Sequence, residues 1–153
     1  MSKHQPALLG GLFIGVLSSL PLINLANCCC LWVLAGGVLV VYLKQQNTPL
    51  PVETGDSALG GLLAGAIGGL LFCLVQAFIM RASGPLVLEQ MRSQVGSQDV
   101  PPEVMAFMER LFTGQGFVVL MFALVVPIYA VFAMLGSLLG LVFFRKKTPP
   151  AQA

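Results

Sequence analysis

Long stretches without a charged side chain constrain this chain more than any other feature. They run from Gln5 to Leu43, from Ser57 to Met80 and from Gly116 to Phe144. A helix needs roughly 20 apolar residues to cross about 30 Å of hydrocarbon. Only 9% of the 153 residues are charged, whereas soluble domains carry about 25%. The sequence therefore predicts an α-helical integral membrane protein.

The first tract is long for one crossing and short for two. Residues 7–43 would form about 55 Å of helix, against roughly 60 Å for two full crossings. Pro21 and Asn24 favour a turn near the middle. We therefore predict two short or tilted membrane helices, over 7–25 and 29–43. The alternative is a re-entrant hairpin that enters and leaves on one side, which requires its loop backbone to be buried in protein.

The other two tracts predict one membrane helix each, over 57–80 and 116–144, and the last is long enough to tilt. Between them, residues 81–115 form a polar segment with apolar residues at the spacing of one helical face, namely Val104, Phe107, Met108 and Leu111. The predicted fold is thus all-α and polytopic. It has four transmembrane helices, a short amphipathic helical insertion between the third and fourth, and a tail over 145–153.

The basic residues predict the orientation of these helices. With four crossings, one side of the membrane holds five of them: Lys3, Lys44, Arg145, Lys146 and Lys147. The opposite side holds three: Arg81, Arg92 and Arg110. Because basic residues favour the cytoplasmic side, we expect both chain ends to be cytoplasmic.

Two parts of the sequence indicate an internal duplication. Gly10–Leu20 can be laid over Gly60–Leu70 without a gap, and Ala35–Lys44 resembles Leu135–Arg145. The simplest interpretation is two related hairpins, as parallel repeats about an axis along the membrane normal. The alternative is coincidence, because glycine and leucine recur in any membrane helix.

Small residues recur four apart and are candidates for helix packing, because they let backbones approach closely in lipid. These candidates are Gly11, Gly15, Ser19, Gly61, Gly65, Gly69, Gly136 and Gly140. They could hold the chain's own helices together, or they could form an interface with a second copy or with another membrane protein.

Four cysteines form a possible thiol cluster: Cys28, Cys29, Cys30 and Cys73. Paired CxxC motifs, which a zinc site would use, are absent, and adjacent residues point in different directions. We expect neither metal nor cofactor. The cysteines are interpreted as small packing groups, with a bridge from the run to Cys73 as the alternative.

No motif predicts a particular chemistry. His4 is the single histidine and lies at the N-terminus, and no acid or base falls inside a predicted membrane helix, which argues against ion-coupled transport. Basic residues are not clustered in the body of the chain, so no nucleic-acid partner is expected. We predict a non-enzymatic scaffold or accessory subunit acting by helix association in membrane lipid. The alternatives are a small channel or transporter around the glycine stripes and Gln76 and, more distantly, a thiol-dependent membrane enzyme.

The runs Leu20–Trp32 and Gly55–Gly65 carry a family resemblance. With the residues around them, over about 7–75, they resemble small uncharacterised prokaryotic integral membrane proteins with four helices. The resemblance implies a bacterial inner-membrane location, and it transfers no active site.

Overall fold

The computed structural model describes residues 4–20, 30–95, 101–113 and 115–144, and every regular element in these ranges is helical. The all-α fold class is therefore confirmed for this part of the chain. The helices are α1 (Gln5–Ser19), α3 (Leu31–Asn47), α4 (Thr54–Val95), α5 (Pro102–Thr113) and α6 (Gln115–Phe144).

The first two helices begin and end at other residues than predicted. α1 ends at Ser19, and Leu20 is extended, with φ −80° and ψ 121°. Pro21 explains this end, because proline disfavours the helical conformation at the residue before it. The rest of the predicted 7–25 span lies outside the described residues. α3 begins at Leu31 and continues four residues beyond the predicted end at 43.

α4 is a single helix of 42 residues, so it continues 15 residues beyond the predicted membrane span over 57–80. This continuation takes in the first part of the polar segment that was predicted over 81–115. Glu89, Gln90 and Met91 are good helix formers, which favours this continuation. The amphipathic stretch predicted around Val104 and Phe107 forms a helix of its own, α5. α6 agrees with the predicted 116–144 to within one residue and passes through Pro127.

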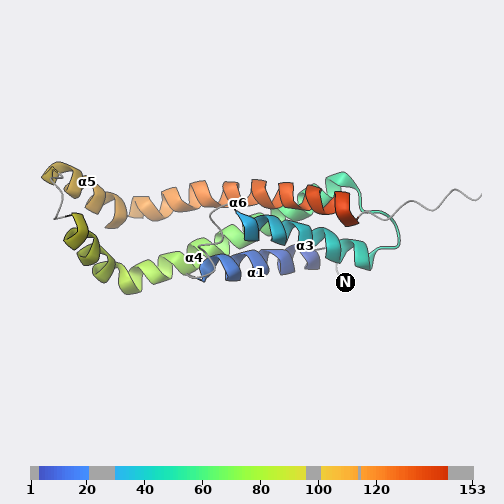
Figure 1. Ribbon diagram of the computed structural model, residues 1–153, viewed down its shortest axis with the longest axis horizontal. Coiled ribbons are helices and arrows are strands. Elements are labelled where there is room, and N and C mark those ends of the chain that lie inside the picture. Colours follow the sequence, from blue (N-terminus) through green and yellow to red (C-terminus); the bar gives the residue numbers. More distant parts are fainter. Residues whose placement is uncertain (1–3, 21–29, 96–100, 114, 145–153) are drawn as a thin grey trace, which may run out of the picture.

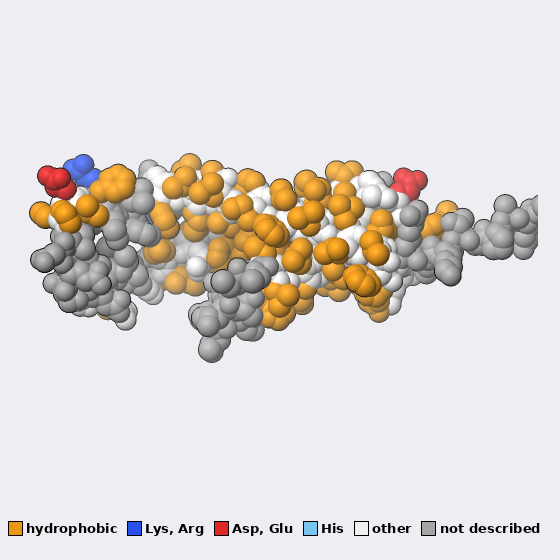
Figure 2. Space-filling view, turned by 45° about the horizontal axis from the view of Figure 1, so that its top comes forward, with side chains coloured by type: hydrophobic (Ala, Val, Ile, Leu, Met, Phe, Trp, Pro, Cys, Tyr) orange, Lys and Arg blue, Asp and Glu red, His pale blue; other side chains and the backbone are white. Residues whose placement is uncertain are grey.

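Two of the described helices are long and apolar enough to cross a membrane, over Thr54–Ser83 in α4 and Gly116–Phe144 in α6. α1 is apolar but has only 15 residues, which is about 22 Å of helix. The prediction of four crossings is therefore not confirmed. Figure 2 shows hydrophobic side chains along the visible face, with charged groups near its two ends.

Four helices, α1, α3, α4 and α6, lie side by side in a bundle (Figure 1). The start of α1, the connection from α3 to α4 and the end of α6 lie together at one end, which we call the base. The last turns of α4, from Arg81 onward, and α5 form the other end, which we call the head. α1 and α3 accompany α4 and α6 only near the base (Figure 1).

The two hairpins, α1–α3 and α4–α6, lie next to each other without the predicted rotation. α1 packs beside α4, and α3 packs beside α6, each pair running in the same direction. A two-fold axis along the membrane normal would instead place α1 diagonally across the bundle from α4. The expected axis is therefore wrong, and the second hairpin is related to the first more nearly by a sideways shift.

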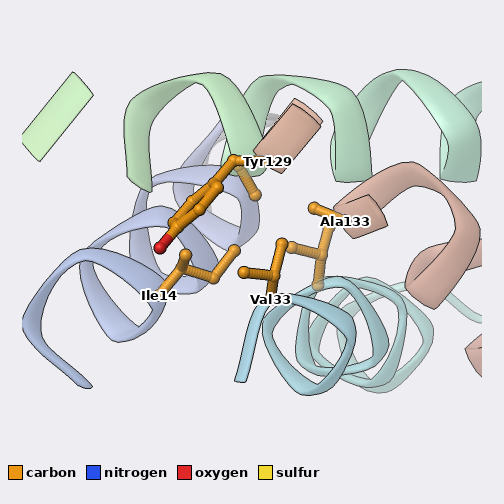
Figure 3. Close-up of a cluster of buried hydrophobic side chains, with 6 residues drawn as sticks. Ile14, Val33, Tyr129 and Ala133 are labelled. Atoms are coloured by element: carbon orange, nitrogen blue, oxygen red, sulfur yellow. The ribbon is translucent and has the colours of Figure 1, made fainter. Parts of the chain in front are cut away.

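The centre of the bundle is an apolar cluster to which each of its four helices contributes (Figure 3). Ile14, Val33 and Ala133 are fully buried there. Tyr129 lies among them, and its ring stacks on that of Phe72 with 5.5 Å between centroids. This cluster fixes the level at which the candidate packing residues meet.

Candidate functional site: the glycine-lined helix interfaces

The interface between α1 and α4 is built on glycines from both helices. A Cβ atom on Gly11 would lie 2.8 Å from the Cβ of Ile67, and one on Gly15 would lie 2.8 Å from the Cβ of Leu71. From the α4 side, a Cβ on Gly68 would lie 2.6 Å from Ile14. Distances below 3.0 Å do not occur between real atoms of this kind, so side chains here would push the helices apart.

The interface between α4 and α6 places backbone directly on backbone. A Cβ on Gly61 would meet the Ser137 hydroxyl, and one on Gly65 would meet the carbonyl oxygen of Tyr129. Gly69 is less tightly enclosed, with Tyr129 Cβ at 3.2 Å from the added atom. Close approach of this type lets membrane helices gain dispersion contacts with each other in place of contacts with lipid.

α3 packs against α6 in the same manner. A Cβ on Gly136 would meet the Leu34 carbonyl oxygen, and one on Gly140 would lie 3.0 Å from the Cα of Val38. All seven glycines predicted from the sequence therefore face another helix of the same chain. Ser19, the eighth predicted residue, is half-buried, and its hydroxyl donates a 2.6 Å hydrogen bond to the Gly15 carbonyl oxygen of its own helix.

Where two glycines are adjacent in the sequence, each of them faces a different helix. A Cβ on Gly10 would meet Val40 of α3, whereas one on Gly11 would meet Ile67 of α4. The same division holds elsewhere: Gly36 faces α1 and Gly37 faces α6, Gly60 faces α3 and Gly61 faces α6, and Gly68 faces α1 and Gly69 faces α6. Consecutive helical residues point about 100° apart, which matches the near-right angle between two neighbours in a four-helix bundle.

Five of these residues, Gly10, Gly36, Gly37, Gly60 and Gly68, were missed by the sequence interpretation. A search for small residues four apart follows one face of a helix and overlooks the face next to it. The signal that could have found them is the Gly-Gly doublet itself, which recurs in three helices of the chain.

Polar groups at the base join α4 to α3 and to α6. The Lys44 ammonium nitrogen lies 3.6 Å from a carboxylate oxygen of Asp56 and donates a 2.7 Å hydrogen bond to the Asp56 carbonyl oxygen. Gly60 leaves room for this ammonium group, which lies 3.0 Å from where a Cβ would be. The buried hydroxyl of Ser57 donates to the Ser137 carbonyl oxygen at 3.1 Å, joining α4 to α6.

The turn between α3 and α4 is held by one buried side chain. The Gln45 amide nitrogen donates to the Leu50 carbonyl oxygen at 3.0 Å, and the Gln45 amide oxygen accepts from the Val52 backbone N–H at 3.1 Å. Both polar ends of the side chain are thus satisfied inside the protein. Sequence periodicity gave no sign of this role.

Comparison with known families gives a match over almost the whole chain. The chain matches the model described as the MJ1491 transmembrane domain over residues 4–148, a range that includes all five helices. The chain belongs to this family. No curated protein and no solved structure matches it.

Membership of the MJ1491 transmembrane domain family makes the chain a membrane protein, as its apolar helices indicate. The matched range also includes the head, so the polar segment between the long helices is part of the MJ1491 domain.

The predicted thiol cluster is only partly described in this MJ1491 domain. Cys28 and Cys29 lie outside the described residues. Cys30 precedes α3 in the left-handed conformation, with φ 52°, and is half-buried against the central cluster. Cys73 is fully buried, with its sulfur 4.0 Å from the Met121 carbonyl oxygen. Both Cys30 and Cys73 are free thiols, so the structure has no bridge between them.

His4 and Gln76, the other polar candidates within the described ranges, lie apart from each other. His4 is exposed at the base, Gln76 is half-buried on α4, and Asn24 and Asn27 fall outside the described residues. Within the described ranges, no three histidine, cysteine or acidic side chains come together as a possible metal site.

Proposed function

We propose that this chain is a non-enzymatic membrane scaffold or accessory subunit whose partner contacts the head. The observation that carries this proposal is the exposure of large apolar side chains beyond the membrane-spanning parts of α4 and α6. Leu86 on α4 is 71% exposed, and Phe107 on α5 is 65% exposed. In water, such side chains favour burial against a partner by about 25 cal/mol for each Å² covered.

The form of α5 supports this role. Val104 and Phe107 are both exposed and lie on one side of the helix, flanked by Glu103 and Arg110, whereas Ala106 points about 130° away from the middle of that side. The one helix with which α5 makes a substantial contact is α6. A helix with one apolar face is a common binding element, because that face fits an apolar groove of a partner.

A photocrosslinker placed at Phe107 tests the proposal in cells that naturally encode the chain. We expect one discrete adduct with another protein, and no such adduct when the crosslinker replaces Ala106, which points away from that side. Phe107→Ser should abolish co-purification of that protein, and Ala106→Ser should not. Adducts with lipid alone at Phe107 would mean that α5 lies on the membrane surface, and the scaffold proposal would then be wrong.

The glycine interfaces contribute to this function only indirectly. Since the predicted glycines hold the chain's own helices together, a partner or second copy must use other surfaces. The same occupancy leaves the channel or transporter alternative without a supporting observation, because the glycine faces meet side chains and backbone rather than an open path.

We further propose that the protein lies in a prokaryotic inner membrane with its base in the cytoplasm. The sequence segments that adjoin the base carry five lysine and arginine residues, and the head carries three. This difference supports the orientation. Alkaline phosphatase fused after Ser93, in the head, should be active, whereas the same enzyme fused after residue 148 should be inactive. The opposite pattern would reverse the orientation and leave the scaffold role untouched.

A further inference from the structure

One side of α4 stays apolar where the helix leaves the membrane. Phe78, Ala82 and Leu86 follow one another four residues apart, so they lie within about 80° of one another around the helix axis. All three side chains are exposed, Phe78 to 75% and Leu86 to 71%. We call these three residues the α4 stripe.

The length of α4 indicates where the hydrocarbon ends on the head side. Exposed apolar side chains extend, without a charged residue, from Leu59 near the base to Met80, and the exposed Arg81 follows. These 21 steps correspond to about 32 Å of helix, close to the roughly 30 Å thickness of the hydrocarbon region. The hydrocarbon should therefore end near Arg81.

α6 places this edge at nearly the same level. It runs antiparallel to α4 (Figure 1), and Cys73 of α4 lies beside Met121 of α6, with its sulfur 4.0 Å from the Met121 carbonyl oxygen. The candidate span of α6 begins five residues before Met121, at Gly116, which is therefore level with about Phe78. The two helices thus agree on the edge to within about one helical turn.

At this edge, α4 is polar on some sides and apolar on another. Arg81 is exposed and Ser83 is half-buried, whereas Ala82 between them is exposed and apolar. Basic residues are common anchors at the headgroup level, and Arg81 fits this pattern. On the side of the stripe, the next charged residue is Glu89, eight residues beyond Arg81, which is about 12 Å along the helix axis. The α4 stripe therefore extends past the level at which Arg81 meets the headgroups.

Lipid does not cover the whole stripe. Leu86 lies about 8 Å beyond Arg81 along the axis, at the outer limit of a headgroup layer that is about 5–8 Å thick on each side of the hydrocarbon. A tilted α4 would place the polar edge at different heights on its two sides, but a difference of about 12 Å across a helix roughly 10 Å wide needs a tilt of about 50°. Transmembrane helices tilt by about 0–40°. Leu86 therefore needs a protein neighbour.

We propose that the α4 stripe is the contact surface for a transmembrane helix of the partner protein. That helix packs along α4 at Phe78 inside the bilayer, passes Ala82 at the edge and continues beside Leu86 outside it. The small side chain of Ala82 lets the two backbones approach closely, as the glycines do between the chain's own helices. The partner helix stays apolar for about 8 Å beyond the hydrocarbon, because it faces Leu86 there.

This inference rests on the proposed function, which supplies a partner at the head, and adds that the partner is an integral membrane protein. A soluble partner could cover Leu86 alone. Phe78 lies inside the hydrocarbon, about 12 Å from Leu86 along the axis and on the same side, so one helix running along α4 covers both. The surface between them is continuous, since Ala82 is apolar and Arg81 points about 100° away.

Photocrosslinkers at Phe78 and Leu86, in cells that naturally encode the chain, test the depth of the partner. We expect both positions to give an adduct with the same protein, and we expect that protein to stay in the membrane after extraction with alkaline carbonate. Met80 is the matched control, because it is exposed at nearly the depth of Phe78 but points about 160° from the middle of the stripe. It should crosslink to lipid and not to that protein.

Other adducts would overturn the proposal. A protein adduct at Leu86 with lipid alone at Phe78 would show that the partner is soluble, and the proposed function would stand. An adduct between two copies of this chain at both positions would assign the stripe to self-association. Lipid alone at both positions would show that the bilayer covers the stripe, and the crosslinker at Phe107 decides separately whether the head has a partner.

A pair of tryptophan variants tests the close approach at the membrane edge. Ala82→Trp puts a large side chain on the stripe, whereas Arg81→Trp puts the same side chain about 100° away, and tryptophan suits the interface at both positions. Co-purification of the crosslinked protein should fall about tenfold for Ala82→Trp, a loss of about 1.4 kcal/mol, and stay within about twofold for Arg81→Trp. Equal recovery with both variants, each with an unchanged melting temperature, would contradict a helix packed against Ala82.

Discussion

Single hydrogen atoms in place of side chains set the distance between neighbouring helices in this protein. The clearest case is Gly37 on α3, where an added Cβ would meet the carbonyl oxygen of Ala133 and the backbone nitrogen of Ser137. Both obstacles belong to the backbone of α6, which cannot rotate away as a long side chain can. The position therefore excludes even the smallest side chain unless the two helices separate.

Gly37→Ala should accordingly lower the free energy of unfolding by about 1–3 kcal/mol, the usual cost of forcing extra atoms into a well-packed core. Gly55→Ala is the matched control, because no atom lies within 4 Å of its added Cβ. That control should be neutral, or stabilising by up to about 1 kcal/mol through helix propensity. Unfolding in mixed micelles, followed by circular dichroism, measures both. Equal stability of the two variants would contradict the close approach of α3 and α6.

Gln45 gives a second prediction at this scale. Gln45→Leu leaves the buried Val52 backbone N–H without its partner and also removes the partner of the carbonyl oxygen of Leu50, a residue that is 67% exposed. One buried polar group left unsatisfied costs about 1–3 kcal/mol. Gln46→Leu is the control, since Gln46 is exposed and bonds only to the Tyr42 hydroxyl. The same unfolding assay should show a clear loss for Gln45→Leu and little change for Gln46→Leu.

At the scale of helices, each Gly-Gly doublet serves a corner of the bundle. One glycine of each pair packs against one helix, and the other glycine packs against a different helix. The doublets therefore favour a compact square of helices over a flat layer. Replacing one member should loosen one helix contact and leave the contact of its twin in place.

α4 gives an element-scale prediction because it is continuous from the membrane into the head. Spin labels at Phe78→Cys and Ser93→Cys, 15 residues apart, should lie about 22 Å apart along the helix axis. The pair Leu59→Cys and Leu74→Cys has the same spacing within the membrane span and provides the reference. Double electron–electron resonance should give similar, narrow distance distributions for both pairs. A shorter or much broader distribution across residues 81–85 would indicate a break.

Much of this architecture could be predicted from the sequence, for reasons that particular residues make plain. The absence of charge between Gly116 and Phe144 predicts the position of α6 in the sequence, and the spacing of Val104 and Phe107 predicts that of α5. The continuation of α4 past Arg81 could not be predicted, because a change in polarity marks the edge of the membrane and not the end of a helix. The glycine stripes were recognisable as packing faces, but which helix each one meets depends on the lateral order of the hairpins, which no local pattern encodes.

The exposed apolar surface of α4 and α6, here called the apolar belt, has a length that determines which bilayer thickness fits the protein. Along α6, the candidate span of 29 residues corresponds to about 43 Å and must tilt in an ordinary bilayer, whereas the exposed part of α4 corresponds to about 32 Å. A very thin bilayer would expose part of both helices to water.

Thermal stability should therefore depend on lipid chain length. In vesicles of phosphatidylcholine with 14-, 18- or 22-carbon monounsaturated chains, the melting temperature should be lowest in the thinnest bilayer, since mismatch costs fractions of a kcal/mol per Å. Circular dichroism in each lipid measures this. A melting temperature that falls steadily as the bilayer thickens would show that the belt is shorter than the exposed side chains of α4 indicate.

The confinement of charge to the base and the head also bears on how the protein is made. With the base in the cytoplasm, as proposed above, the insertion machinery of the cell must carry one charged stretch through the bilayer, the segment of about 35 residues between Met80 and Gly116. Both flanking helices are long and apolar enough to partition into lipid once that segment has passed. The newly made chain can therefore leave all its other ionic groups on the side where the ribosome delivers them.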